Sequence, residues 1–267
     1  MNGFERLAYS PDDFKAIQGL VSEHAGINLR DGKQELVYSR LAKRVRKLGF
    51  NNFRDYCHHL AGDEEEILHC INSMTTNVTS FFREGHHFEF LAGEVLHNAT
   101  SKVRVWSAGC STGEEPYSIA FTASASPAQV EITATDLDTH VLQHASNGVY
   151  RLKDVAGLEQ ASLKKWFLRG KGSRQGQVRV NRQFRDMVNF SRLNLKEAWT
   201  WPEPFDVIFC RNVMIYFDHE LRSRLIERFH QHLKPGGYLI LGHSESLFGL
   251  SNRFRVVGKT IHRKEDS

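Results

Sequence analysis

The chain has 267 residues, of which 40% are hydrophobic and 25% are charged; these are globular values and exclude a largely disordered protein. With 20 glycines and 6 prolines, the chain is neither collagen-like nor proline-rich. The formal net charge of +4 permits an acidic partner without requiring one. Because the four cysteines form no CxxC pair, the N-terminus lacks a secretory pattern and no apolar run approaches the ~20 residues of a membrane span, we expect a cytoplasmic protein.

The first 75 residues predict helices alone. Ser10, followed by Pro11 and two aspartates, is a helix start signal, and apolar residues follow at helical spacing. Segments 36–48, 51–60 and 63–73 predict three more helices. The first of these carries apolar residues on one face and basic residues on another, and the basic set is Arg40, Lys43, Arg44 and Lys47, with Arg46 beside it.

Beyond about residue 100, predicted strands and helices alternate. The strands are 103–106, 130–134, 205–210 and 238–241, and the helices are 113–125, 139–146 and 218–233. Such alternation indicates an α/β fold with a parallel sheet and crossover helices. Segments 254–257 and 260–263 predict a closing antiparallel hairpin. Three further strand-like runs, 166–168, 177–180 and 187–190, predict a small antiparallel sheet inserted at about 160–192.

The glycine-containing turn after the first strand is the most informative segment. Gly109 and Gly113 frame it, and Glu114 and Glu115 follow. Two carboxylates would repel phosphate, so a phosphate-binding loop is excluded. The stretch also matches GxSxG with Ser111 as the nucleophile of a hydrolase. The helical residues upstream, and the negative charge beside the oxyanion that such a site must stabilise, weigh against the hydrolase.

A nucleoside cofactor that carries a cation fits this turn better. Glu114 or Glu115 could accept a ligand ammonium, and Asp136 ends the second strand 23 positions after Gly113, where dinucleotide-binding folds place the acid that binds ribose. S-adenosylmethionine has a ribose, an ammonium and a sulfonium. The alternative without a ligand is a tight turn followed by a helix cap at Asp136.

Six segments stand in one order along the chain: NVTSFFRE at 77–84, GEEPYS at 113–118, ATDLD at 134–138, FCRNVMIYF at 209–217, LKPGGYL at 233–239 and GHSES at 242–246. Together they resemble the CheR family, the chemotaxis receptor glutamate methyltransferases, over nearly the whole chain. The first and the fourth of these segments are the most specific.

The resemblance implies a helical domain at 1–75, a linker at 76–100 and a class I, Rossmann-like methyltransferase domain at 101–267. It also implies S-adenosylmethionine as methyl donor, S-adenosylhomocysteine as product and receptor glutamates as acceptors. A cofactor-binding sensor without turnover is the alternative.

The resemblance implies roles for individual residues as well. Glu114, or else Glu115, should meet the methionine ammonium, and Asp136 the ribose. Arg83 and Tyr216 should orient the reacting groups. The remaining cofactor residues should be Asn77, Thr79, Asn194, Leu195, Arg211 and Asn212, with Arg83 again among them.

Two receptor contacts are also implied. The basic helix face that contains Arg44 should dock on the cytoplasmic helical signalling domain of a receptor; a solvated surface is the alternative. RNA is not expected, because that face lacks interleaved aromatic residues. The loop after residue 168 resembles that of family members that hold a receptor C-terminal peptide, which implies a tether through Arg169, Lys171, Arg174 and Arg179, or otherwise a structural insert.

The expected protein is a monomer without membrane insertion or a metal site. The histidine pairs 58–59 and 86–87 are the only adjacent ones, and neighbouring side chains on a helix diverge. We therefore expect these histidines to be solvent or packing positions.

Overall fold

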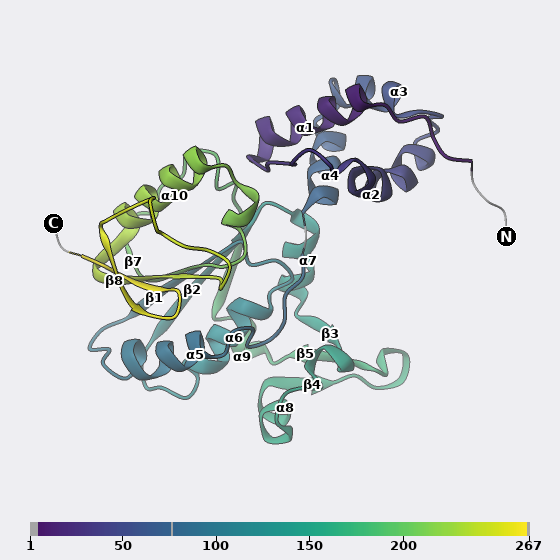
Figure 1. Ribbon diagram of the computed structural model, residues 1–267. Coiled ribbons are helices and arrows are strands. Elements are labelled where there is room, and N and C mark those ends of the chain that lie inside the picture. Colours follow the sequence, from purple (N-terminus) through teal and green to yellow (C-terminus); the bar gives the residue numbers. More distant parts are fainter. Residues whose placement is uncertain (1–4, 76, 266–267) are drawn as a thin grey trace. The chain divides into compact units, whose positions relative to one another are not determined.

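The computed structural model describes residues 5–75 and 77–265 and divides the chain into two compact units (Figure 1). One unit comprises Met1–Thr76 with Tyr216–Leu221, and the other comprises Asn77–Ile215 with Arg222–Ser267. The division lies beside the boundary expected after residue 75; Thr76, the first residue of the expected linker, lies outside the described residues.

The first unit is helical, as the sequence predicts. Its helices are α1 Pro11–Ala25, α2 Gln34–Lys47, α3 Phe53–Leu60 and α4 Glu64–Met74. The Ser10 hydroxyl caps α1 by accepting the N–H of Asp13, and the Asp63 carboxylate caps α4 by accepting the N–H of Glu66. Helix α1 buries its apolar face through Phe14, Ile17 and Val21.

The second unit is built on a seven-stranded sheet with the order β6-β2-β1-β7-β8-β10-β9. Its strands are β1 Val103–Ala108, β2 Val130–Asp136, β6 Val188–Arg192, β7 Phe205–Cys210, β8 Leu233–Leu241, β9 Phe254–Gly258 and β10 Ile261–Lys264. The strands from β6 to β8 run parallel, and the predicted hairpin β9–β10 closes the sheet in antiparallel fashion. The α/β prediction is confirmed.

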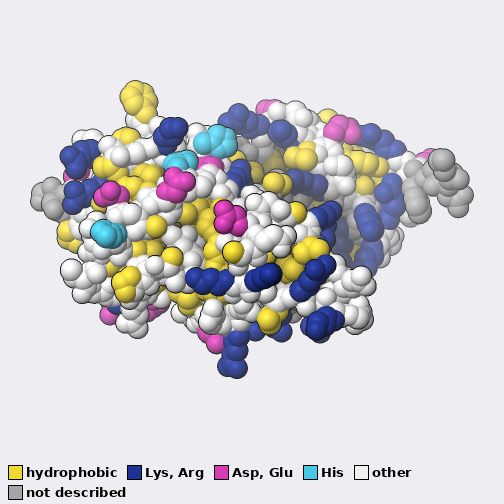
Figure 2. All heavy atoms as spheres, turned by 90° about the horizontal axis from the view of Figure 1, so that it is seen from below, with side chains coloured by type: hydrophobic (Ala, Val, Ile, Leu, Met, Phe, Trp, Pro, Cys, Tyr) yellow, Lys and Arg dark blue, Asp and Glu magenta, His cyan; other side chains and the backbone are white. Residues whose placement is uncertain are grey.

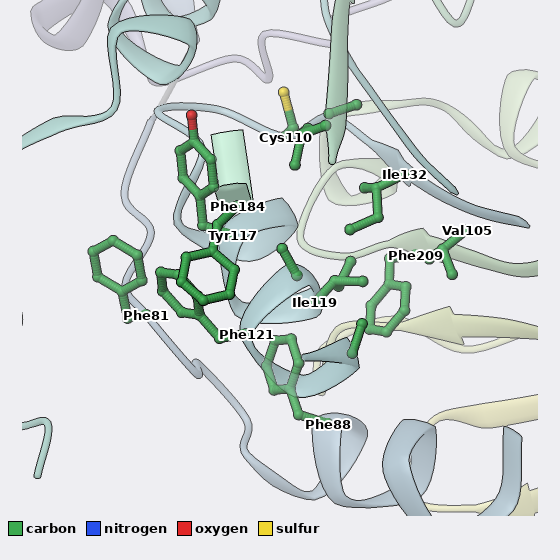
Figure 3. Close-up of a cluster of buried hydrophobic side chains, with 14 of the residues drawn as sticks. Phe81, Phe88, Val105, Cys110, Tyr117, Ile119, Phe121, Ile132, Phe184 and Phe209 are labelled. Carbon is green, nitrogen blue, oxygen red and sulfur yellow. The ribbon is translucent and has the colours of Figure 1, made fainter. Parts of the chain in front are cut away.

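Helices cover both faces of this sheet (Figure 1). Helix α10, His219–His232, lies on one face, where the ring of Phe229 is 5.5 Å from that of Trp106. The other face holds α5 His86–Phe90, the π-helical turn η1 Leu91–Leu96, α6 Glu114–Ala123 and α7 Thr139–Asn147. The sequence did not predict the helical segment 86–96, which places Phe88 in the core with its ring 6.0 Å from that of Phe209 (Figure 3).

The small sheet is antiparallel and has the order β3-β5-β4. It consists of β3 Val149–Arg151, β4 Phe167–Arg169 and β5 Gln177–Val180, with the helices η2 Leu152–Val155, α8 Gln160–Trp166 and η3 Gly172–Arg174 between them; α9 Arg182–Arg185 follows.

The prediction that 187–190 belongs to the small sheet is wrong, because β6 pairs in parallel with β2 of the large sheet. The ring of Phe190 in β6 lies 5.8 Å from the ring of Tyr117, which belongs to the helix α6 that packs on the large sheet. The insertion therefore begins earlier than residue 160 and ends before residue 187. Among the described helices, none is long and apolar enough to span a membrane.

Candidate functional site

Two glycines shape the turn that follows β1. Gly109 and Gly113 have φ angles of 84° and 96°, in the left-handed region that favours glycine. A Cβ atom at Gly109 would lie 2.4 Å from Cγ2 of Val213, and one at Gly113 would lie 2.7 Å from Cβ of Ala145. The backbone of this turn therefore lies close to the segment after β7 and to α7, at the edge where parallel strands end and ligands bind.

Asp136 ends β2 beside this turn. One of its carboxylate oxygens accepts the N–H of Ser111 at 2.8 Å, and the other accepts the N–H of Asp138 at 3.0 Å. Both oxygens retain lone pairs for hydroxyl donors. Burial raises the pKa of Asp136, although hydrogen bonds from backbone N–H groups oppose the shift.

An open cavity of about 990 Å³ lies on the α6 side of the turn. Linker residues 77–80 form one wall, and the end of α7 and the small sheet form others. Glu114 lines this cavity, and its carboxylate accepts the Thr112 hydroxyl at 2.6 Å. Burial raises the pKa of Glu114, and no Lys or Arg pairs with it among residues 5–75 and 77–265. The cavity therefore presents a buried carboxylate that no Lys or Arg of the described chain contacts, although Arg151, Arg174 and Arg179 line other parts of its wall.

Glu115 has a different environment from Glu114. Its Oε1 accepts the Ser107 hydroxyl at 2.7 Å, and its Oε2 accepts Nη1 of Arg211 at 3.0 Å. Glu115 does not line the cavity. Of the two glutamates that the sequence left as alternatives, Glu114 is the one that lines the cavity.

The linker contributes Asn77 and Thr79 to the cavity wall. The Asn77 amide donates to Asp138 Oδ2 at 3.1 Å, and the Asn77 carbonyl accepts the Ser111 hydroxyl at 3.4 Å. Arg83 lies further along the linker, half-buried, and its guanidinium donates to the carbonyl of Val78 at 2.9 Å.

Two more predicted pairs lie at the ends of neighbouring strands. Asn194 and Leu195 are buried just beyond β6, and the preceding N–H, of Leu193, donates to the Asp136 carbonyl at 3.0 Å. Arg211 and Asn212 follow β7. Asn212 has a φ of 59°. A Cβ atom at residue 242 would lie 2.5 Å from Nδ2 of Asn212, so the Asn212 amide has room only because residue 242 is glycine. The carboxyl ends of β2, β6 and β7 thus collect these residues at one edge.

Tyr216 is grouped with the helical unit, where its carbonyl accepts the N–H of Asn28 at 2.7 Å. Its role beside the transferred methyl stays a prediction. Ser111, the nucleophile of the hydrolase alternative, has a φ of 48° and bonds the Asn77 carbonyl. No histidine of the described chain hydrogen-bonds its hydroxyl, so the base that a serine nucleophile needs is missing.

The basic face of α2 divides into two groups. Arg40 donates to the carbonyls of residues 73–75 at the end of α4, Arg44 binds the buried Glu66, and Arg46 donates to the Glu5 carbonyl. Lys43 and Lys47 are exposed. Three of the five residues predicted to dock therefore also hold the helical unit together.

The residues predicted to tether a peptide are also distributed. Arg174 and Arg179 line the cavity that contains Glu114, whereas Arg169 and Lys171 are exposed on and after β4. A Cβ atom at Gly170 would lie 2.1 Å from the Arg174 carbonyl oxygen, so glycine is required where this loop closes. Figure 2 shows a face of the molecule on which Lys and Arg side chains predominate over acidic ones.

The histidine pair at 86–87 meets one expectation and not the other, because His87 is buried as a packing residue but the two side chains do not diverge. Their rings lie 4.1 Å apart and both approach the Lys259 carbonyl, so the prediction that these side chains diverge is wrong. His87 is fully buried, and burial lowers its pKa to about 4. Within the described ranges, no group of three or more His, Cys, Asp or Glu side chains is placed to hold a metal ion.

Glu245, for which the sequence predicted no role, is buried beside the site. Its carboxylate accepts four backbone N–H groups at 2.8–3.0 Å, from Asn212, Val213, Met214 and Gly242. Burial raises the pKa of Glu245, although these four donors oppose the shift. The sequence signal was the glutamate within the GHSES segment, but its four partners come from the fold.

Comparison with known proteins gives two family matches. The model described as "CheR methyltransferase, all-alpha domain" matches residues 12–75, and the one described as "CheR methyltransferase, SAM binding domain" matches residues 77–263.

Named relatives are similar over nearly the full chain. The chemotaxis protein methyltransferase of Escherichia coli K12 is 44% identical over 265 residues, which cover 97% of this chain and 92% of the relative. Chemotaxis protein methyltransferase 2 of Pseudomonas aeruginosa is 41% identical, covering 97% and 95%. Among solved structures, the N-methyltransferase NodS of Bradyrhizobium japonicum with S-adenosyl-L-homocysteine aligns at a TM-score of 0.36 and 16% identity, over 61% of this chain and 62% of NodS.

Proposed function

The chain belongs to the CheR methyltransferase family, and from this membership we propose that it transfers the methyl group of S-adenosylmethionine to glutamate side chains of chemotaxis receptors. The product on the receptor is a glutamyl methyl ester, and the second product is S-adenosylhomocysteine. The similarity to two chemotaxis protein methyltransferases supports a chemotaxis protein as the acceptor.

The observation that carries the proposal is the pair of carboxylates at this turn, the buried Glu114 and the half-buried Asp136, neither of which is ion-paired to Lys or Arg in the described chain. A buried carboxylate is costly unless it is paired or hydrogen-bonded. An ammonium would pair the charge of Glu114, which is bonded to the Thr112 hydroxyl, and ribose hydroxyls would bond the lone pairs that Asp136 retains beside its two backbone N–H donors. The residues present therefore fit S-adenosylmethionine, which supplies an electrophilic methyl group on a cationic sulfur when it is bound.

The remaining residues would complete the site. Asn77 and Thr79 would contact the cofactor from the linker wall of the cavity. Asn194 and Leu195, which adjoin Asp136, would flank the adenine. Arg211 and Asn212, which follow the carboxyl end of β7, would close the site.

Methyl transfer to glutamate requires little acid–base catalysis by the protein. A glutamate side chain has a pKa of about 4.3 in water, so the acceptor is already an anion at neutral pH. We therefore assign no general base. Arg83 and Tyr216 would orient the acceptor, and the chain would align the reacting atoms and exclude water.

Removal of the Asp136 carboxylate tests the cofactor assignment. We expect Asp136→Ala to weaken S-adenosylmethionine binding about tenfold or more, since a charge-assisted hydrogen bond contributes ~1.5–3 kcal/mol. Titration calorimetry measures this. Asp206→Ala is the matched control, because that carboxylate also accepts a backbone N–H, from Arg104 at 2.7 Å, but at the opposite edge of the sheet.

An unchanged affinity in Asp136→Ala would contradict the ribose assignment. Turnover is a separate measurement: transfer of labelled methyl to receptor-bearing membranes should give a base-labile ester. Cofactor binding without transfer would favour the sensor alternative.

We further propose that the exposed lysines of α2 dock the enzyme on the acidic helical signalling domain of its receptor. Lys43→Glu with Lys47→Glu should lower the rate of receptor methylation and leave cofactor affinity unchanged, and the loss should deepen at low salt, where surface charges are less screened. The control reverses two other exposed lysines of the helical unit, Lys15 and Lys33. Equal rates for both double variants would reduce the α2 face to a solvated surface.

The small sheet is proposed to hold a receptor C-terminal peptide. Strand β4 is an edge strand with Leu168 59% exposed, so an extended peptide can be added there with Arg169 and Lys171 beside its acidic groups. We expect at least one receptor tail to bind with roughly micromolar affinity and Arg169→Glu with Lys171→Glu to abolish binding. Lys164→Glu with Lys165→Glu on α8 is the control. If no receptor tail gives heat on titration, the tether is ruled out.

A further inference from the structure

The linker turn that presents Arg83 is held in an unfavourable conformation. Its two neighbours, Phe82 and Glu84, have φ angles of 54° and 57°, which non-glycine residues rarely adopt. Such residues persist only where the surroundings over-determine the backbone, and they cluster at functional sites. The structure must therefore contain contacts that fix residues 82–84.

Part of that fixation is apolar. Phe81 is buried and lies beside Phe121 in the core of the second unit (Figure 3). The N–H of Phe82 donates to the Ser118 hydroxyl at 2.9 Å. These contacts anchor the start of the turn to α6, but they leave Arg83 and Glu84 to be held by something else.

Arg211 contacts the second part of the turn, where Nδ1 of His243 also lies 3.1 Å from Oε1 of Glu84. The Arg211 side chain is 2% exposed, and its Nη2 donates to the Arg83 carbonyl and lies 3.6 Å from Oε2 of Glu84. Its Nη1 donates to Glu115 at 3.0 Å. The buried guanidinium therefore binds the linker at the Arg83 carbonyl and at the Glu84 carboxylate.

Glu115 in turn fixes Arg211. Its second oxygen accepts the hydroxyl of Ser107 at 2.7 Å, and Ser107 is fully buried in the central strand β1. A chain of contacts therefore runs from the rigid sheet through Ser107, Glu115 and Arg211 to the Arg83 backbone. All four residues belong to the second unit.

We propose that Glu115 is a positioning residue for methyl transfer, which acts through Arg211 to hold the linker turn that presents Arg83. This proposal rests on the proposed function for its effect on catalysis, but its effect on the linker is independent of any ligand. Glu115 does not line the cavity, whereas Glu114, beside it in sequence, does.

The first test uses Glu115→Gln, which keeps the size of the side chain and removes its charge. Hydrogen exchange of the ligand-free protein should become faster at amides 81–84. The control is Glu131→Gln, which removes a carboxylate 3.5 Å from the buried Arg104 near the start of β1 and should leave these amides unchanged. Unchanged exchange in Glu115→Gln would overturn the proposal. Should Glu115→Gln fail to fold, Ser107→Ala provides the same readout with a milder change.

The second test is a double-mutant cycle on receptor methylation. Glu115→Gln should lower kcat about 10- to 100-fold, the range expected for a small misplacement of an aligned group. In an Arg83→Ala background the same substitution should cost less than about twofold, because its effect is transmitted through Arg83. Equal losses in both backgrounds would show a general structural role instead. A wild-type protein that transfers no methyl would refute the proposed function, whereas the exchange experiment would still decide the role of Glu115.

Discussion

We expect Glu245→Ala to lower the free energy of unfolding by about 4 kcal/mol or more. The substitution leaves four backbone N–H groups buried without an acceptor, and each orphaned donor costs roughly 1–3 kcal/mol before water enters the space. Three of these donors belong to the turn after β7, where Asn212 holds a left-handed conformation. Urea unfolding followed by circular dichroism gives the change directly.

Glu245→Gln sharpens this test. Its amide nitrogen would turn a donor toward backbone donors, so it should recover little of the lost stability. Exposed Glu94 on η1 is the control, and Glu94→Ala should unfold at the wild-type urea concentration. A Glu245→Gln protein as stable as the wild type would mean that the four N–H groups do not require a carboxylate.

The second large effect is expected in the helical unit. Arg44→Glu should destabilise that unit by about 3–5 kcal/mol, the usual consequence of breaking a buried ion pair from one side. Glu66 is 2% exposed; its carboxylate accepts Nε of Arg44 at 3.0–3.1 Å and the hydroxyl of Tyr56 at 2.9 Å. Lys43→Glu reverses an exposed charge on the same helix and should leave the unfolding midpoint nearly unchanged.

The same ion pair predicts a pH dependence. Burial alone would raise the pKa of Glu66, but hydrogen bonds from Arg44 and Tyr56 lower it below its ordinary value. A lowered carboxyl pKa stabilises the fold fully above the ordinary glutamate pKa, and this stabilisation is lost as the pH falls through the lowered value. Urea midpoints of Glu66→Gln should therefore decline less steeply on acidification than those of the wild type. Parallel declines would contradict the assignment.

The fold was largely predictable because its signals are local. Cap residues such as Ser10 and Asp63 and the strand-to-helix alternation after residue 100 each depend on a few neighbouring positions. Strand partners are not local. The run at 187–190 was recognised as extended, but its pairing with β2 depends on residues some 55 positions away, and the sequence placed it in the wrong sheet.

The candidate site shows the same division. Glycine spacing indicated the turn at Gly109, and the acid at Asp136 followed from its place at a strand end. The sequence does not show whether Glu114 or Glu115 lines the cavity. That choice depends on the hydrogen bonds that Glu115 accepts from Ser107 and Arg211, and no spacing rule contains that information. For the same reason, the GHSES motif contains Glu245 but does not predict its four backbone partners.

The segment that forms the small sheet begins and ends at neighbouring points of the second unit. Gly148 precedes β3, and its carbonyl accepts the N–H of Val180, the last residue of β5, at 2.9 Å. A segment whose ends already meet imposes little constraint of length on what lies between them, because extending such a loop costs only slowly increasing entropy. The loops within residues 149–180 can therefore lengthen or shorten during evolution while the strands on either side keep their register, whereas Tyr150 and Phe167, whose rings pack on Phe81, keep the small sheet joined to the core of the unit.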